Sequence, residues 1–118
     1  MTIRQITRKF IQGTHFSKMW KELGFIEDDL LRLEIMLLNN PKIGDVIQGT
    51  GRLRKLRFSF PGRGKRGSVR VCYVDFEKIE TVYLLAVFAK NEQENLSQAE
   101  RNSLKKQIDT LEKTLCGG

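Results

Sequence analysis

The chain has 118 residues, of which 40% are hydrophobic, and a formal net charge of +7. This length suffices for one modest core, so we expect a single domain over residues 1–118. Charged and polar residues interrupt the first twenty positions, which excludes a signal peptide or a membrane-spanning segment there and favours a cytoplasmic protein. The positive balance favours nucleic acid, an anionic membrane surface or an acidic protein as the partner.

The N-terminal part predicts a short strand over residues 9–12, followed by two helices. Thr14 is suited to cap the first helix, and Gly24 to end it. Acids at residues 27–29 suit the positive end of the second helix dipole. The apolar residues at helical spacing are Phe16, Met19, Trp20 and Leu23 in the first helix and Ile26, Leu30, Leu33 and Leu37 in the second.

From Lys55 onward the pattern alternates, which is typical of strands. Lys55 and Arg57 point to one side of the first of these strands, and Leu56 and Phe58 to the other. In the next strand Val69, Val71 and Tyr73 alternate with Arg70, Cys72 and Val74. Residues 81–89 are nearly all apolar, as in a buried central strand, and the short connection at residues 77–80 predicts a hairpin. These three strands should form an antiparallel meander.

A capping box at residues 97–100 predicts a last helix. One face of this helix is apolar and consists of Leu104, Ile108, Leu111 and Leu115. None of the helices carries a basic face beside a strong apolar one, which disfavours a membrane-surface protein.

The positive charge gathers between residues 52 and 70. This segment contains no acid and eight basic residues: Arg52, Arg54, Lys55, Arg57, Arg63, Lys65, Arg66 and Arg70. Like charges on adjacent strands repel one another and cost stability unless an anion regularly occupies the site. That anion could be RNA or the acidic face of a protein inhibitor. The alternative is a solvated face that only keeps the protein soluble.

A glycine-rich loop carries part of this charge. Gly62, Gly64 and Gly67 form the pattern G-x-G-x-x-G, which also occurs in dinucleotide-binding and kinase loops. A dinucleotide site needs a strand before the glycines and a helix after them, whereas a strand follows here, and a kinase needs a much longer chain. A basic glycine loop can instead lay its N–H groups along a phosphodiester backbone.

Histidine, metal and thiol chemistry are not indicated. His15 is the single histidine, so a ribonuclease built on paired histidines is excluded. The acids are dispersed, and neither Cys72 nor Cys116 has a partner at ligand spacing, so we expect two free thiols and no metal or cofactor. Any RNA cleavage must therefore rely on lysine, arginine and tyrosine.

Five linked motifs resemble HigB toxins of the RelE/ParE superfamily. They are NPKIGDVIQGTG at residues 40–51, LRKLR at 53–57, GRGKRG at 62–67, RVCY at 70–73 and FAKNE at 88–92. The resemblance covers residues 26–112 and implies an α+β fold in which two N-terminal helices pack on a small curved antiparallel sheet with a C-terminal helix. It implies the toxin of a type II toxin–antitoxin system, which cuts messenger RNA in the ribosomal A site. The partner would be an antitoxin, often a helix-turn-helix protein.

The resemblance also implies the site. Lys55 and Arg57 correspond to basic residues on the second strand, Arg70 to the arginine that holds the scissile phosphate, and Lys90 to a catalytic cation at a strand end. Further RNA contacts are expected from Arg54, Arg63, Lys65, Arg66, Tyr73 and Asn91. Asn91 and Leu96 stand where the RelE pattern has an arginine and a tyrosine, which leaves Lys90 or Tyr73 as the general acid.

The expected reaction is attack of a ribose 2′-hydroxyl on the neighbouring phosphate. Arg57 and Arg70 would stabilise the charge that grows on the phosphoryl oxygens, and Lys55, among like charges, would act as base. The rival is a non-enzymatic toxin of the same fold, like the ParE branch, which poisons DNA gyrase by binding. The paired strand cations favour the nuclease, because a pure binder has no need of a cluster centred on a phosphate.

Overall fold

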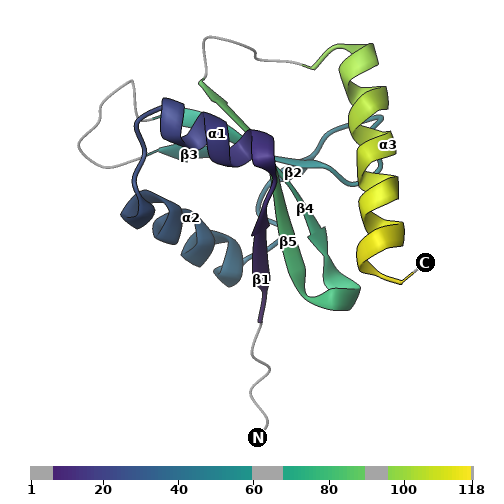
Figure 1. Ribbon diagram of the computed structural model, residues 1–118, viewed down its shortest axis with the longest axis horizontal. Helices are drawn as coiled ribbons and strands as arrows, with labels where there is room; N and C mark the ends of the chain where they lie inside the picture. Colours follow the sequence, from purple (N-terminus) through teal and green to yellow (C-terminus); the bar gives the residue numbers. More distant parts are fainter. Residues whose placement is uncertain (1–6, 60–67, 90–95, 118) are drawn as a thin grey trace, which may run out of the picture.

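The computed structural model describes residues 7–59, 68–89 and 96–117, which fold as an α+β unit (Figure 1). The elements follow in the order β1 (Lys9–Gln12), α1 (Thr14–Glu22), α2 (Glu27–Asn39), β2 (Asp45–Val46), β3 (Arg54–Ser59), β4 (Ser68–Phe76), 3-10 helix η2 (Glu77–Ile79), β5 (Thr81–Ala89) and α3 (Gln98–Leu115). This confirms the predicted α+β fold with two N-terminal helices and a C-terminal helix. No helix in the described ranges is long and apolar enough to cross a membrane.

The sheet has five strands in the order β1-β5-β4-β3-β2. Strands β3, β4 and β5 form the predicted antiparallel meander, and η2 closes the hairpin between β4 and β5. The sheet is mixed, however, because β1 runs parallel to β5, with Lys9 opposite Thr81. The short strand β2, which the sequence pattern did not predict, pairs with β3 at the other edge.

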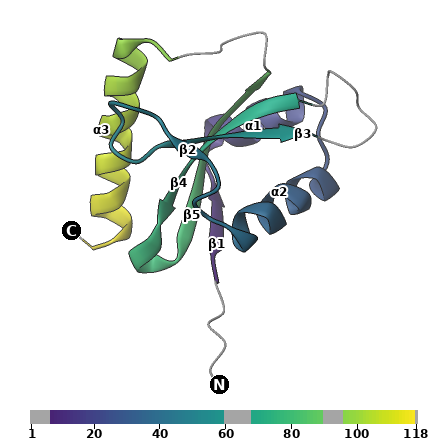
Figure 2. The ribbon, with the colours of Figure 1, turned by 180° about the vertical axis from the view of Figure 1, so that it is seen from behind.

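The helices cover opposite faces of the sheet (Figures 1 and 2). Phe16 and Trp20 of α1 and Leu33 and Leu37 of α2 are buried against one face, in a cluster with Leu56, Phe58, Val69, Val71 and Tyr73. On the other face, Ile108 of α3 is buried with Leu53, Cys72, Val74, Phe76 and Leu85. The alternation in β3 and β4 therefore assigns each side chain to one of the two faces of the sheet.

Two details at the starts of the helices differ from the sequence-based expectation. Gly13, not Thr14, is the residue before the first turn of α1, and it provides no side-chain cap. Ile26 does not join the apolar stripe of α2, because it precedes the helix and is 56% exposed. The neighbouring Phe25 is buried instead, while the Asp29 carboxylate accepts a hydrogen bond of 2.9 Å from the Ile26 N–H.

Candidate functional site

Three cations of the basic segment share the face of the sheet on which α3 packs. Because Leu56 and Phe58 face the α1 and α2 core, Lys55 and Arg57, which alternate with them in β3, point to the opposite face. The register then places Arg57 opposite Arg70, and Lys55 opposite Cys72. Directly opposed residues on antiparallel strands lie about 5 Å apart, so the structure brings Lys55, Arg57 and Arg70 together as the sequence predicts.

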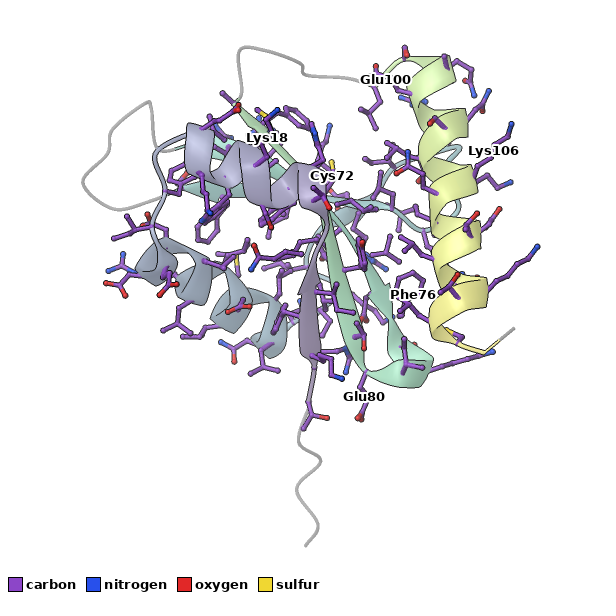
Figure 3. The ribbon with its side chains drawn as sticks, in the orientation of Figure 1. Lys18, Cys72, Phe76, Glu80, Glu100 and Lys106 are labelled. Atoms are coloured by element: carbon purple, nitrogen blue, oxygen red, sulfur yellow. The ribbon has the colours of Figure 1, made fainter. Side chains whose placement is uncertain are left out.

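This face changes from apolar to charged along the strands. In β3, Leu53 just before the strand is fully buried, Lys55 is half-buried and Arg57 is exposed. In β4, Phe76 is buried beside α3 (Figure 3). Arg70, at the other end of the strand, is half-buried. Helix α3 therefore covers the apolar half. We call the other half, defined by Lys55, Arg57 and Arg70, the cation face.

The cation face holds unsatisfied polar atoms. The Nη1 atom of Arg70 is buried and finds no hydrogen-bond partner within residues 7–59, 68–89 and 96–117. The same holds for the Oγ atom of Ser68, which lies two residues before Arg70 on the same face. A buried polar group without a partner costs free energy, so these atoms favour an acceptor supplied by a ligand. Sequence reasoning did not single out Ser68, although the alternation of β4 places it beside Arg70.

The nearest acid on β4, Asp75, pairs with Arg8 and not with Arg70. The Asp75 carboxylate accepts hydrogen bonds from Arg8, at 2.7 Å from Nε and 3.2 Å from Nη2, and Lys42 Nζ lies 3.9 Å away. The hydrogen bond to Asp75 is the main reason why the pKa of Arg8 is raised.

Tyr73 is a structural residue, which corrects its expected role in RNA contact or proton donation. Its side chain is fully buried on the α1 and α2 side of the sheet, away from the cation face. The hydroxyl donates a hydrogen bond to the Pro41 carbonyl and accepts one from the Gly44 N–H, both at 2.9 Å. Burial is also the main reason why the pKa of Tyr73 is raised.

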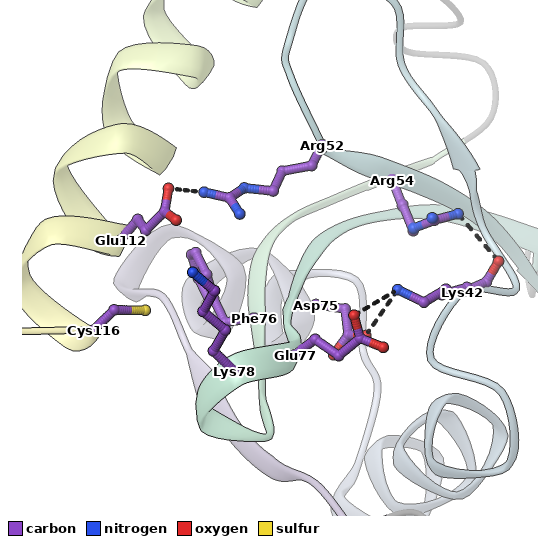
Figure 4. Close-up of a pocket in the computed structure, with 9 residues that line it drawn as sticks. All are labelled: Lys42, Arg52, Arg54, Asp75, Phe76, Glu77, Lys78, Glu112 and Cys116. Atoms are coloured by element: carbon purple, nitrogen blue, oxygen red, sulfur yellow. Dashed lines mark hydrogen bonds and ion pairs between the residues drawn. The ribbon is translucent and has the colours of Figure 1, made fainter.

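Arg54 also lies apart from the cation face. Its guanidinium donates hydrogen bonds to the carbonyl of Gly44 at 2.7 Å and to that of Lys42 at 3.2 Å. Arg54 lines a pocket of about 220 Å³ whose walls carry both acidic and basic side chains (Figure 4). In this pocket Lys42 pairs with Asp75 and Glu77, and Arg52 pairs with Glu112. The structure therefore holds the Arg54 guanidinium on carbonyl groups of the loop at residues 42–44, away from the expected RNA contact.

Cys72 lies under the cation face next to Lys55. Burial raises the pKa of its thiol to about 12, and the positive charge of Lys55 acts in the opposite direction. The thiol therefore stays protonated at neutral pH and is not an activated nucleophile. Both Cys72 and Cys116 are free thiols.

Five predicted RNA contacts or catalytic residues fall outside the described residues: Arg63, Lys65, Arg66, Lys90 and Asn91. Their roles stay predictions. His15 is exposed on α1, where it lines a groove beside α3. Within the described part of the chain, no group of three or more histidine, cysteine or acidic side chains could hold a metal ion.

Comparisons with known proteins match this chain to a toxin family. A family model described as the RelE toxin of the RelE/RelB toxin–antitoxin system matches residues 8–115. Among solved structures, the chain is similar to the E. coli toxin RelE in the free state, in a form with two arginines mutated to alanine. The TM-score is 0.59 at 15% identity, and the match covers 86% of this chain and 97% of that one. At this identity the likeness shows a common fold.

Proposed function

The chain belongs to the family of RelE toxins of RelE/RelB toxin–antitoxin systems, and from this premise we propose that it cuts messenger RNA on the ribosome. The observation that carries the proposal is the cation face, where Arg57 lies opposite Arg70 and a buried nitrogen of Arg70 has no partner in the described residues. A phosphodiester can supply hydrogen-bond acceptors to such a pair of guanidinium groups.

In the proposed reaction the ribose 2′-oxygen forms a bond to phosphorus while the bond from phosphorus to the 5′-oxygen breaks. The products are a 2′,3′-cyclic phosphate and a free 5′-hydroxyl. Negative charge grows on the phosphoryl oxygens in the transition state, and Arg57 and Arg70 stabilise it as fixed donors. Arginine suits this role because its planar fork matches a phosphate and it stays charged.

Two lysines complete the proposed proton transfers. Lys55, two residues before Arg57 on the same face, accepts the proton of the 2′-hydroxyl in its neutral amine form and becomes an ammonium. Lys90 donates a proton to the leaving 5′-oxygen. In the sequence, Lys90 follows Ala89, the last residue of β5. Ala89 lies opposite Val69, the residue before Arg70 in β4. No histidine takes part in this scheme.

The proposal also includes the partners. The basic loop residues Arg63, Lys65 and Arg66, together with Asn91, would contact RNA or the ribosome. The motifs of the sequence favour the HigB branch of the superfamily, whose antitoxin is often a helix-turn-helix protein. Lysine and arginine lack a pKa near neutrality, so we expect the ribosome to orient the 2′-hydroxyl and naked RNA to be cut poorly.

The test is a brief induction of the chain in growing cells. Incorporation of labelled amino acids should stop before incorporation of labelled thymidine, and new 5′ ends should appear within translated messages. The same mapping with translation initiation blocked should show few new ends. If DNA synthesis stops first while protein synthesis continues, the toxin acts on gyrase in the manner of the ParE branch. A matched induction of the Arg70→Ala variant controls for effects of expression alone.

A further inference from the structure

Arg101 is an inward-facing arginine near the start of α3. It precedes Leu104 by three residues and Ile108 by seven, so it lies on the helix face that packs against the sheet. Its side chain is half-buried, whereas the neighbouring Glu100 and Asn102 are exposed. The apolar inner face of α3 therefore begins with a cation.

A loop before β3 packs against the stem of Arg101. A Cβ atom added to Gly49 would lie 3.8 Å from the Cδ atom of Arg101, which is van der Waals contact. The same loop is closed by a hydrogen bond of 2.8 Å from the Ile47 N–H to the Leu53 carbonyl. Leu53 precedes Lys55 by two residues on the same face, a separation of about 7 Å along a strand. Arg101 thus lies beside the loop that leads into β3, the strand that carries Lys55.

Arg101 shares an unusual property with the cation face. In the described ranges, Ser68 Oγ, Arg70 Nη1 and Arg101 Nε are buried and lack a hydrogen-bond partner. All three belong to residues on the α3 side of the sheet. Because buried donors are nearly always satisfied, their concentration on one side favours a ligand that brings several acceptors.

Arg52, which links the same loop to α3, differs from Arg101 because it has an acidic partner. Arg52 forms an ion pair with Glu112 and lies over the ring of Phe76, 5.5 Å from its centroid. Arg52 therefore has a carboxylate partner within the protein. Arg101, which is also half-buried, forms no ion pair with any acid in the described part of the chain.

We propose that Arg101 binds a backbone phosphate of the RNA a few nucleotides away from the scissile one and so forms the helix side of the site. This inference rests on the proposed function. A single-stranded RNA carries a phosphate at every nucleotide, so a strand held at Arg57 and Arg70 brings further phosphates to the border of the cation face. Arg101 touches the RNA there but not the reacting atoms, so it contributes binding energy equally to substrate and transition state.

The test is single-turnover cleavage of a defined messenger on purified, programmed ribosomes with the full chain. Arg101→Met keeps the straight apolar stem against Gly49 but removes the charge, and Arg101→Lys keeps the charge but loses the planar fork. Lys113→Met, an exposed position on α3, is the matched control for the loss of one charge. Arg101→Met should raise the half-saturating ribosome concentration about tenfold with little change in the rate at saturation, and Arg101→Lys should recover part of this loss.

A second measurement does not depend on cleavage. Binding of a short single-stranded RNA, followed by fluorescence anisotropy at increasing salt, should lose about 0.7 from its logarithmic salt slope in Arg101→Met. Wild-type protein that cuts no messenger on ribosomes would refute the proposed function, and the salt slope would still decide the role of Arg101. The inference is wrong if Arg101→Met matches Lys113→Met in both measurements, as expected if Arg101 instead meets a carboxylate of a partner protein. It is also wrong if both Arg101 variants lose binding only in proportion to a lower melting temperature.

Discussion

Arg57 lies directly opposite Arg70 on neighbouring antiparallel strands, so two guanidinium groups occupy one side of the sheet at adjacent positions. Like charges placed opposite each other destabilise a pair of strands. The sheet therefore holds an arrangement that costs stability in the free protein and becomes favourable when a phosphate lies between the two groups. Mutations at these positions should change stability and activity in opposite directions.

The first prediction concerns Arg70. Arg70→Ala should reduce cleavage about a hundredfold, which corresponds to roughly 3 kcal/mol of transition-state stabilisation for one lost donor. The melting temperature should stay the same or rise, because the mutation removes repulsion and an unsatisfied buried nitrogen. Single-turnover cleavage and a melting curve on the same preparation measure both effects. A variant that unfolds readily, or that still cuts, would show that Arg70 is a structural residue.

The second prediction reverses the charge opposite Arg70. Arg57→Glu creates an acid and a base on directly opposed positions and should stabilise the sheet by about 0.5 kcal/mol. Cleavage should be lost, because the new carboxylate repels the phosphate and forms an ion pair with Arg70. Urea unfolding gives the stability and ribosome-programmed cleavage gives the activity. Arg32→Glu, an exposed position on α2, provides the control for the change in net charge. Retention of activity by Arg57→Glu would place the phosphate elsewhere.

The third prediction separates the structural role of Tyr73 from a catalytic one. Tyr73→Phe leaves the Pro41 carbonyl and the Gly44 N–H without their partner in a buried place. The free energy of unfolding should fall by at least about 2 kcal/mol, since two buried groups are left unpaired and each costs between about 1 and 3 kcal/mol. Cleavage per folded molecule should remain close to that of the wild type. An equally stable variant that no longer cuts would restore Tyr73 as a candidate acid.

The fourth prediction follows from the raised pKa of Cys72. The folded protein keeps the thiol proton up to about pH 12, whereas the unfolded chain loses it near the ordinary value of 9.0. The stabilising contribution is therefore complete below pH 9.0 and is lost as the pH rises towards 12.

Urea unfolding of wild type and Cys72→Ala at about pH 8 and about pH 10.5 isolates this effect, because all other titrating groups are common to both proteins. The wild type should lose more stability than Cys72→Ala between the two values. In the folded protein at about pH 8, a thiol reagent should modify the half-buried Cys116 and leave Cys72 unmodified. Equal pH dependence in the two proteins would contradict the burial of the thiol.

Alternation along β3 and β4 was enough to predict that Lys55, Arg57 and Arg70 share a face. This worked because each strand buries one side completely, so a shift by one residue would expose Leu56 and Val71. The order of the elements and the β4–β5 hairpin were likewise predictable from local patterns. These features depend only on residues close to one another in the sequence.

Features that depend on distant partners were not predictable in this way. The face of the sheet on which Tyr73 lies was predictable from alternation. Its hydroxyl, however, forms hydrogen bonds with Pro41 and Gly44 in a loop before β2, and the local pattern did not show that the hydroxyl is already bonded. Arg54 is adjacent to Lys55 in sequence yet bonds carbonyl groups of that same loop. The parallel pairing of β1 with β5 joins the two ends of the sheet-forming chain, and no local pattern specifies it.

That parallel pairing also sets the order in which a newly made chain can fold. Residues 9–12 pair with residues 81–84, so the first strand can join the sheet only after the last strand has left the ribosome. Strand β4, which carries Arg70, needs the same late strand on its other side. Contacts between residues so far apart form slowly compared with local ones. The cation face of this toxin can therefore form only after nearly the whole sheet-forming part of the chain has been synthesised.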